Sequence, residues 1–423
     1  MRKIQPSERI SKEISEILEN GYKGNENLMD VFIKKSIKKM IQEILEQEVM
    51  DYLGRDYYER NSNSKSGYRN GYENKPLKTA EGKIDIEVPQ LRDTEETYRS
   101  GLLSQMKTIS PELERLAIEM YVRGLSTRDI EDTLKDKDGR RLLSKDSVSE
   151  ITESLSEEYE RFISRDLSGY DVVYLFIDGV YESLRREAGF KEAILVAWGI
   201  LSNGRKVLLH LSLGNKESYE SWKQFFRNMI SRGLRMPLLI VSDGAPGLIK
   251  AIEECFPESK RQRCMVHKLR NIANKLPQNV LEELMPKIRN VFNQTDKEIA
   301  LMCAAKIIDE YAQKYPSAIK CFQEDLDSCL NFMLFPAGHH KHIRTTNLLE
   351  RAFVEQKRRT KIIPRFLNEK SCIKLVYSTL IRVSEKWRRV KMSEYDLALL
   401  RNIRHLYGWK EDENGFISKK IAA

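Results

Sequence analysis

The sequence has little cysteine and no long apolar run, and each absence argues against a class of protein. Its six cysteines in 423 residues show no paired CxxC spacing, so a disulfide framework is not indicated and a reducing compartment is the default. No apolar run approaches the roughly 20 residues of a membrane-spanning helix, and residues 1–8 lack the apolar core of a signal peptide. No internal repeat or low-complexity tract is visible. We therefore expect a cytoplasmic protein with no membrane partner.

Positive charge is what the chain has in excess. The formal net charge is +9, within a composition of 41% hydrophobic and 32% charged residues that is typical of a globular chain. An even spread of cations would indicate only solubility, but here they cluster, which favours a polyanionic partner such as nucleic acid. The clusters lie at 185–186, 260–263, 357–361 and 386–389.

Hydrophobic periodicity predicts helices and a short β element in the first hundred residues. Apolar residues recur at three- and four-residue steps across 28–53, the pattern of an amphipathic helix. The polar, glycine-bearing stretch 60–72 interrupts that pattern and is expected to be a loop or turn. Residues 83–89 alternate apolar and polar side chains, which predicts a strand.

Three consecutive helix signals follow between residues 110 and 155. Ser110 and Pro111 suit the start of a helix that ends at Gly124. Ser126 or Thr127 can cap a short second helix, and a third begins after residue 144. Helix, glycine turn and short helix are the outline of a helix-turn-helix, while an ordinary small helical bundle fits the spacing equally well.

The section from about 170 to 270 changes character and predicts a mixed sheet. Its strand candidates are 172–177, 193–200, 206–213 and 238–241, and Asn203-Gly204 is a strong hairpin signal between the second and third. A helix with Trp222 on its apolar side separates the last two strands. The fold class is therefore α/β, a mixed sheet with helices packed on it. From about 279 to 335 the pattern is helical without strand signals, and a further helix covers 345–360.

Two aspartates each end an apolar strand candidate and precede a glycine. Asp178 follows 172–177, and Asp243 follows 238–242. If the two strands are neighbours, both carboxylates lie at one edge of the sheet. Paired carboxylates in that position hold divalent metal ions against a phosphate in many proteins.

A third acid is offered by Glu350 on the helix 345–360. Thr346, Asn347, Glu350 and Lys357 share one polar face, while a separate apolar stripe can pack against the core. Glu350 can therefore face the sheet edge, with Lys357, Arg358 and Lys361 near enough to bind phosphates. The plainer interpretation is a surface glutamate paired with Arg351 or Lys357.

Several further side chains invite a functional interpretation. Cys264 and His267 supply two zinc ligands where four are usual, and Cys255 offers a third, so we favour a strand-end element in which His267 contacts a phosphate or a carboxylate. The three histidines 339, 340 and 342 are expected in a flexible, basic loop that faces DNA. Trp387 lies among cations and is expected to be half-buried, although stacking on a base is the alternative.

Six stretches together resemble the Mutator-type bacterial insertion-sequence transposases, members of the DDE recombinase superfamily. They follow in order along nearly the whole chain, and they are specific as a series, although each is weak alone. Two departures concern Gln90, where the family often has arginine, and the loosely matching stretch 364–369. The six stretches are SGYRNGY at 66–72, GLSTRDI at 124–130, IDGVY at 177–181, SDGAPGL at 242–248, QRCMVHKLRN at 262–271 and RTTNLLER at 344–351.

The resemblance implies a fold, a site and a cofactor. It implies a ribonuclease-H-like mixed sheet with an all-α insertion, preceded by a mainly helical DNA-binding region with a helix-turn-helix. Asp178, Asp243 and Glu350 match the catalytic, metal-binding triad, supported by Cys264 and His267 in the family's Cys-x-x-His element and by Asn347. The implied cofactor is Mg²⁺ as two ions, for which Mn²⁺ substitutes. The expected regions are 1–105 for DNA-end binding and oligomerisation, 106–165 for the helix-turn-helix, 166–278 for the first part of the catalytic core, 279–340 for the helical insertion and 341–423 for the completion of the core.

The expected partner is double-stranded DNA, as terminal inverted repeats and as target, bound by a homodimer or larger oligomer near the nucleoid. The expected reaction is DNA strand cleavage followed by strand transfer through attack of a 3′-hydroxyl. An inactive DNA-binding regulator and a ribonuclease-H-type nuclease remain alternatives. Expected DNA contacts are Tyr68, Arg69, Arg128, Arg185, Arg263, Lys268, Arg270, Arg344, Arg351, Lys357, Arg358 and Lys361.

Overall fold

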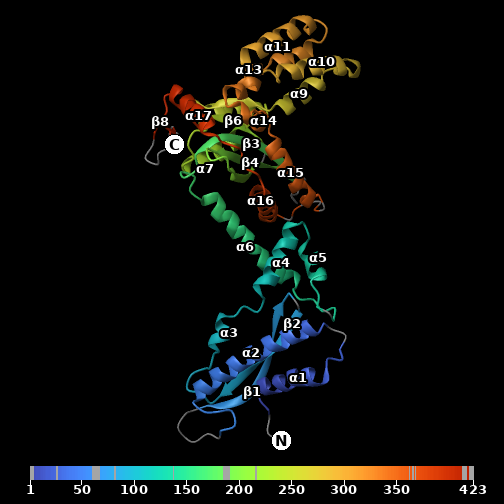
Figure 1. Cartoon of the computed structure of the whole chain (residues 1–423), viewed down its shortest axis with the longest axis vertical. Coiled ribbons are helices and arrows are strands. Elements are labelled where there is room, and N and C mark those ends of the chain that lie inside the picture. Colours follow the sequence, from blue (N-terminus) through green and yellow to red (C-terminus); the bar gives the residue numbers. More distant parts are fainter. Residues whose placement is uncertain are drawn as a thin grey trace. The chain divides into compact units, whose positions relative to one another are not determined.

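The computed structural model describes most of the chain as two compact units. The units are Met1–Glu153 and Ser154–Ala423, and each is described by itself (Figure 1). The described residues are 4–24, 27–59, 67–80, 82–136, 138–183, 191–214, 217–361, 363, 366, 368–411 and 417–418.

The first unit begins with two helices and a β-hairpin. The helix predicted over 28–53 is confirmed, with Asn27 accepting a hydrogen bond from the Met29 amide at its start and Gly54 in a left-handed conformation at its end. Glycine suits this position because it has no Cβ to clash there. A small apolar core of Leu45, Leu77, Ile84 and Ile86 joins helix and hairpin. The elements are α1 (Pro6–Asn20), α2 (Leu28–Leu53), β1 (Tyr68–Thr79), β2 (Gly82–Arg92) and α3 (Gly101–Gln105).

The hairpin confirms the strand predicted over 83–89 and corrects the loop predicted beside it. Residues 60–66 lie outside the described part, but Tyr68 to Tyr72 belong to β1 and pair with β2. The pairing register shifts between Arg69 and Tyr72, a bulge that includes Gly71 at φ 85°. Most of β1 is polar and only Leu77 is buried, so the alternation that reveals a half-buried strand is missing from the sequence.

One face of α2 leaves a row of apolar side chains in solvent. Ile33, Ile37, Met40 and Ile44 are 46%, 41%, 62% and 45% exposed. Their steps of four, three and four residues place them in a single stripe along the helix. The opposite face of α2 packs on the unit, so this stripe is a second apolar surface of the same helix.

The three helices predicted after residue 110 are present with their predicted caps. Ser110 accepts a hydrogen bond from the Leu113 amide, and Ser126 forms a capping box with Asp129. A cluster that includes Leu113, Ile130, Leu142 and Val148 forms the core of this bundle. An isolated bridge between Lys135 and Arg141 lies in the connection to the third helix. The helices are α4 (Pro111–Val122), α5 (Thr127–Thr133) and α6 (Lys145–Ser164).

The second unit is built on a five-stranded mixed sheet, which confirms the α/β class. The strand order is β5-β4-β3-β6-β7, with β3, β4 and β5 antiparallel in sequence and β6 and β7 parallel to β3. Four strands were predicted, but β7 was not. The strands are β3 (Val172–Ser183), β4 (Lys191–Leu201), β5 (Lys206–Gly214), β6 (Leu239–Ser242) and β7 (Lys260–Arg263).

Helices pack on this sheet and enclose its apolar side chains. Trp198, Trp222 and Phe226 are fully buried, and α7 and α16 both contact β5. The helices of this layer are α7 (Tyr219–Ser231), α8 (Pro246–Cys255), α15 (Asn347–Thr360), α16 (Glu369–Glu385) and α17 (Glu394–Leu406).

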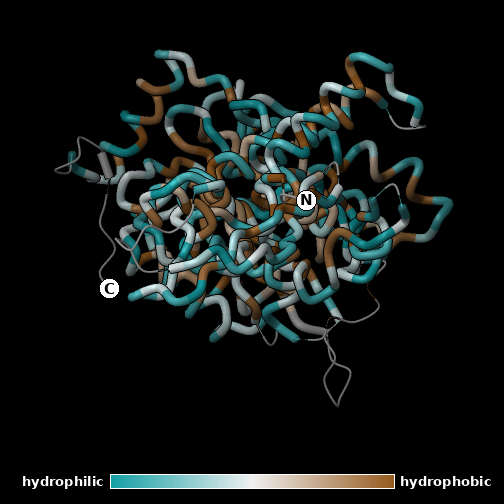
Figure 2. Tube along the Cα trace, turned by 90° about the horizontal axis from the view of Figure 1, so that it is seen from below, coloured by the Kyte–Doolittle hydropathy of each residue, from teal (hydrophilic) through white to brown (hydrophobic). Residues whose placement is uncertain are grey.

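A run of helices separates β7 from α15, as the sequence predicted for 279–335, and forms a lobe beside the sheet (Figure 1). Figure 2 shows hydrophilic and hydrophobic residues alternating along the helices, and within the described ranges no helix is both long and apolar enough to cross a membrane. The remaining elements are α9 (Met265–Ala273), α10 (Gln278–Val291), α11 (Lys297–Tyr311), α12 (Pro316–Gln323), α13 (Leu326–Leu330), η1 (Asn331–Leu334), η2 (Ala337–His339), α14 (His340–Ile343), β8 (Lys410–Glu411) and β9 (Ile417–Ser418).

Candidate active site

Two neighbouring strands bring Asp178 and Asp243 to the same level of the sheet. In the parallel pair β3 and β6, Phe176 lies opposite Val241, and each aspartate follows its strand partner by two residues. The apolar residues before them are fully buried, and this burial anchors both strands in the core. The two aspartates therefore lie on neighbouring strands at the edge where β6 ends, as the sequence predicted. Asp178 does not end its own strand, however, because β3 continues past it and it pairs there with Val196 of β4.

Asp178 is held in an environment that opposes its negative charge. Its Oδ1 accepts a hydrogen bond of 2.9 Å from the Gly179 amide, which favours the ionised form. Burial raises the pKa of Asp178 to about 7, and the charges of Asp243 and Glu217 act in the same direction, against the Gly179 hydrogen bond and the opposite influence of His267. A cation bound at this edge would offset both the cost of burying the charged carboxylate and its repulsion by the neighbouring acids.

Asp243 forms the turn that leads from β6 into α8. Its Oδ1 accepts a hydrogen bond of 3.1 Å from the Ala245 amide, a local turn typical of aspartate. The Arg263 guanidinium lies against Gly244, where a Cβ would overlap it, and Arg263 also pairs with Asp325 at 2.6 Å. Gly244 therefore lets a cationic side chain pass directly beside the second acid.

The start of α15 is tied to the start of α9, and this positions Glu350. The Cys264 sulfur accepts hydrogen bonds of 3.3 Å from both the amide and the hydroxyl of Thr346. The Met265 amide donates to the Arg344 carbonyl oxygen at 3.1 Å. Because Cys264 directly follows β7, these bonds fix the first turn of the helix, and with it Glu350, relative to the sheet.

His267 connects the third acid to the first. Its Nε2 lies 3.8 Å from Oε1 of Glu350. The interaction with the Cys264 sulfur raises the pKa of His267 to about 9, outweighing burial, and the charges of Asp178 and Glu350 add to the effect. The imidazole thus favours its protonated form and places one positive charge beside two of the three acids.

The Cys264 thiol and the His267 ring influence one another. Burial acts to raise the pKa of Cys264, but its hydrogen bonds with His267 and Thr346 outweigh burial and lower it. The Cys-x-x-His element is therefore a contact that orders α15 and charges the ring.

Glu217 is a fourth acid at this edge that the sequence analysis missed. Its carboxylate lies over Gly179, where a Cβ would overlap it. Burial raises the pKa of Glu217, and the charge of Asp243 adds to the shift, while a hydrogen bond with Tyr181 opposes it. Glu217 belongs to no strand end or motif of the kind that marked the other acids. The only local signal is its place just before Ser218, the cap of α7.

The acids suit a magnesium ion in kind. Carboxylate oxygens are the ligands that Mg²⁺ prefers, and Asp178, Asp243 and Glu350 supply them from three elements. Within the described ranges, no group of three or more acidic, histidine or cysteine side chains stands close enough to hold one ion together. The arrangement therefore offers the donors and an uncompensated negative charge, with Glu350 paired to His267.

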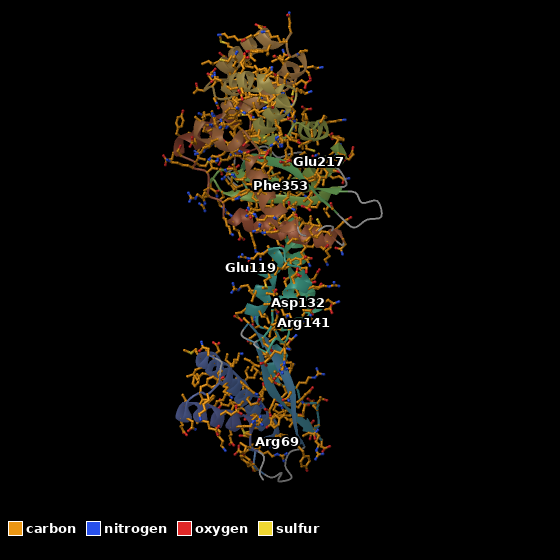
Figure 3. All side chains as sticks on the ribbon, turned by 90° about the vertical axis from the view of Figure 1, so that its right-hand side faces the viewer. Arg69, Glu119, Asp132, Arg141, Glu217 and Phe353 are labelled. Atoms are coloured by element: carbon orange, nitrogen blue, oxygen red, sulfur yellow. The ribbon has the colours of Figure 1, made fainter. Side chains whose placement is uncertain are left out.

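Three predicted DNA contacts belong to the first unit, and a fourth lies outside the described residues. Tyr68 is 46% exposed, and Arg69 donates to the carbonyl oxygens of Arg55 and Asp56 while lying over the Tyr57 ring. Arg69 therefore orders its own unit as well as reaching solvent (Figure 3). Arg128 is exposed on the first turn of α5. Arg185 lies outside the described residues.

The predicted contacts of the second unit divide into buried and exposed cations. Lys268 is fully buried and donates to the Glu324 carbonyl oxygen, which gives it a structural position rather than a surface for DNA. Arg263 is likewise largely enclosed in its pair with Asp325. Arg344 is half-buried, and Asn347, predicted as active-site support, is exposed at the start of α15. The exposed cations are Arg270, Arg351, Lys357, Arg358 and Lys361.

The three histidines before α15 do not form the flexible loop that was predicted. His339 is 1% exposed, and its Nδ1 hydrogen-bonds with the Tyr174 hydroxyl at 2.8 Å. His340 Nε2 lies 2.8 Å from the Phe335 carbonyl oxygen. Both residues lie in short helices, and both rings have hydrogen-bond partners within the unit. Of the three, only His342 lines a surface pocket.

Comparison with known proteins identifies the family of the chain. Residues 11–390 match the family described as "Transposase, Mutator family". The chain is 33% identical to the transposase for insertion sequence element ISRM5 of Rhizobium meliloti (strain 1021), over 84% of this chain and 88% of that protein. It is 29% identical to the transposase for insertion sequence element IS256 in transposon Tn4001 of Staphylococcus aureus, over 89% of this chain and 95% of that protein. The chain therefore belongs to the Mutator family of transposases.

Proposed function

We propose that this chain is a DDE transposase that cuts and rejoins DNA strands at the ends of a bacterial insertion sequence. The observation that carries the proposal is the placement of Asp178 and Asp243 at one sheet edge, with Glu350 3.8 Å from His267, whose charge acts on Asp178. Family membership supports the same chemistry.

The fold supports the proposal at a second level. We propose that the second unit is ribonuclease-H-like, since three antiparallel strands are followed by two that run parallel to the first. The helices between β7 and α15 would be the insertion that separates the second acid from the third. In the first unit, α4, α5 and α6 would form the helix-turn-helix that binds terminal inverted repeats, with Arg128 at its exposed start.

Asp178, Asp243 and Glu350 would hold two Mg²⁺ ions, or Mn²⁺ in their place, which would supply a deprotonated oxygen nucleophile and stabilise charge on the leaving oxygen. Asp178 and Asp243 provide a buried, negatively charged edge that favours cation binding. His267 keeps a proton near Glu350 and so orients that carboxylate, and Cys264 fixes the helix that carries it.

We propose that the protein acts as a homodimer on double-stranded DNA, since two transposon ends must be brought together. The occupant that best fits the exposed stripe of α2 is the same stripe of a second copy. In an antiparallel pair, Ile33 would lie opposite Ile44 and Ile37 opposite Met40, a self-complementary arrangement. Replacing Ile37 and Met40 by lysine should convert the dimer to a monomer in light scattering, whereas replacing the exposed Ile299 of α11 by lysine should not. A monomeric parent protein would contradict this part of the proposal.

The function is tested by cleavage and strand transfer on terminal-repeat DNA with Mg²⁺. The proposal expects both reactions, and expects EDTA to stop them. Cleavage without joining would indicate a ribonuclease-H-type nuclease. Sequence-specific binding without either reaction would indicate a DNA-binding regulator. Activity that is unaffected by EDTA would exclude the metal mechanism.

A further inference from the structure

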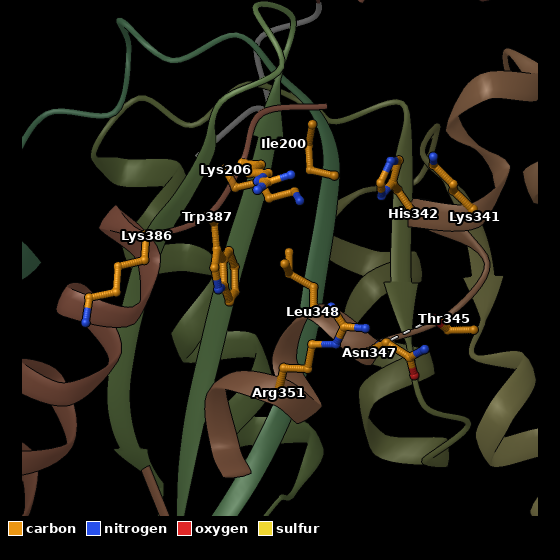
Figure 4. A pocket seen from close by; sticks show the side chains of 11 residues that line it. Ile200, Lys206, Lys341, His342, Thr345, Asn347, Leu348, Arg351, Lys386 and Trp387 are labelled. Atoms are coloured by element: carbon orange, nitrogen blue, oxygen red, sulfur yellow. Dashed lines mark hydrogen bonds between the residues drawn. The ribbon is translucent and has the colours of Figure 1, made fainter. Parts of the chain in front are cut away.

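A basic pocket opens beside the catalytic helix. It has a volume of about 510 Å³, within the range of pockets that hold a ligand of nucleotide size. Figure 4 shows α15 supplying Asn347, Leu348 and Arg351 to one side and Lys206 and Ile200 standing on the strands opposite. The complete lining is Ile200, Lys206, Lys341, His342, Thr345, Asn347, Leu348, Arg351, Lys386, Trp387 and Arg388.

The charges of this pocket are all of one sign. Five of its lining residues are lysine or arginine, and no lining residue is acidic. Burial lowers the pKa of Lys206, and the nearby Arg351 lowers it further. Burial likewise lowers the pKa of His342 to about 4, with Lys206 and Lys341 adding to the effect. Cations that disfavour one another's charge across a pocket are stabilised by an anion placed between them.

The pocket also has an aromatic wall. The Trp387 ring packs on the buried Trp198, with 4.0 Å between ring centroids and 35° between their planes. Trp387 itself is only half-buried and lines the pocket together with Ile200 and Leu348. The packing on Trp198 fixes the Trp387 ring, so its accessible surface is a preformed platform for a flat ligand.

A second basic hollow continues from the first. It has a volume of about 340 Å³ and shares Lys206 and Trp387 with its neighbour. Arg165, Arg205 and Arg389 line it as well, and Glu385 is its one acidic lining residue. Two cationic hollows on either side of one indole suit a chain of phosphates with bases between them better than they suit a single small anion.

We propose that this pocket binds an unpaired nucleotide of a DNA strand, with its base against Trp387 and its flanking phosphates on Lys206, Arg351 and Arg388. An unpaired nucleotide is required because bases inside a duplex are stacked on each other and cannot present a face to a side chain. The inference rests on the proposed function for its choice of DNA. Since Arg351 directly follows Glu350, a strand held here would pass next to the acidic edge.

Tryptophan fluorescence provides a direct test. Trp198, Trp222 and Trp409 are 0%, 0% and 3% exposed, which leaves Trp387 as the accessible indole of the four in the chain. The full-length protein is titrated with a 5′-phosphorylated oligothymidylate that is long enough to form a stable duplex with its complement, and with that blunt duplex. We expect the single strand to quench the fluorescence and the duplex to quench it much less, and Trp387→Phe to abolish the quenching.

Charge variants distinguish binding in this pocket from nonspecific attraction of DNA to a basic protein. Arg388→Ala and Lys206→Ala should each weaken binding of the single strand, and Trp387→Ala should weaken it roughly 5- to 150-fold, the range of one base–aromatic stack. Lys306→Ala, on the exposed surface of α11, makes the same charge change elsewhere and should leave binding unchanged. Circular dichroism and the unfolding midpoint identify any variant that fails to fold, and the exposed Arg388 is the variant least subject to that failure.

The outcomes distinguish this inference from the proposed function. If the wild-type protein cleaves terminal-repeat DNA while the Arg388 and Trp387 variants bind the single strand as well as the control does, the pocket inference is overturned and the transposase proposal stands. If the wild-type protein binds the single strand through Trp387 but cleaves no DNA, the pocket inference stands and the catalytic proposal fails. Equal quenching by single strand and duplex would also overturn the inference.

Discussion

The acidic edge of the sheet and the basic pocket beside it each include residues of α15, and they carry charge of opposite sign. At the edge, burial and the charge of Asp243 raise the pKa of both Asp178 and Glu217, and a single imidazolium offsets part of the effect on Asp178. In the pocket, burial and the neighbouring cations lower the pKa of both Lys206 and His342. Each region is incomplete without a partner of the opposite sign, the first a cation and the second a polyanion.

The difference shows how one short element can serve two tasks. Consecutive residues of an α-helix are about 100° apart around its axis, so Glu350 and Arg351 face different surroundings. Glu350 contacts His267, while Arg351 lines the pocket. Predictions that separate chemistry from binding therefore test whether the two regions are independent.

The largest expected effect is on chemistry alone. Asp178→Asn removes the charge and one oxygen ligand from the edge, and we expect strand cleavage to fall by at least roughly 1000-fold. Affinity for terminal-repeat DNA should change by less than about twofold, because the pocket is untouched. Gel-shift and cleavage assays measure the two quantities on one preparation, and Asp309→Asn, on exposed α11, is the control. Full cleavage activity in Asp178→Asn would remove it from the site.

The buried His210 should make the stability of the protein sensitive to acid. His210 is 4% exposed, and burial together with Arg232 and Arg165 lowers its pKa to about 3 from 6.5. Its folded pKa lies below its unfolded value, so its contribution to stability is complete above pH 6.5 and is lost as the pH falls toward 3. The loss is on the order of 4 kcal/mol.

The measurement is urea unfolding at pH 7 and pH 4 for the parent and for His210→Phe. The variant keeps a ring against Phe225, which packs on His210 with 4.6 Å between centroids, but it cannot gain a proton. We expect it to lose less stability between the two pH values than the parent does. The exposed His405 replaced by phenylalanine is the control, and an equal loss in all three proteins would show that His210 does not control the acid sensitivity.

A smaller effect is expected from Glu217. Glu217→Gln removes one negative charge from the edge without removing a residue of the triad, so the edge should bind Mg²⁺ more weakly. We expect the half-saturating Mg²⁺ concentration for cleavage to rise roughly threefold, with the rate at saturating Mg²⁺ little changed. Glu220→Gln, in the first turn of α7, makes the same change on the exposed side. An unchanged Mg²⁺ dependence would leave Glu217 without a role in the site.

The sequence predicted those parts of the molecule whose signal is local. The strands β3 to β6 were visible because each is an apolar run or lies beside a hairpin turn, and both aspartates were visible because they end such runs. The strand β7 was missed because three of its four residues, Lys260–Arg263, are basic and only Gln262 is buried. Its pairing with β6 comes from the sheet and not from its own composition.

The parts that depend on distant contacts were beyond local patterns. Glu217 reaches the acidic edge by lying over Gly179, and no motif marks that approach. The pocket joins Lys206 to Trp387 across more than a hundred residues of chain. The buried His339 and the half-buried His340 were predicted to lie in a flexible loop, whereas Tyr174 and Phe335 provide partners that only the fold brings near.

The division of α15 into two faces has a consequence for how this gene tolerates change. One residue inserted between Thr346 and Glu350 would rotate everything after it by about 100° and advance it by about 1.5 Å, while Cys264 would still hold the first turn in place. Glu350 would leave His267, and Arg351 would leave the pocket. Substitutions at the exposed Val354 leave the rotational position of the other residues unchanged. Evolution therefore has to conserve the length of this helix more strictly than its composition.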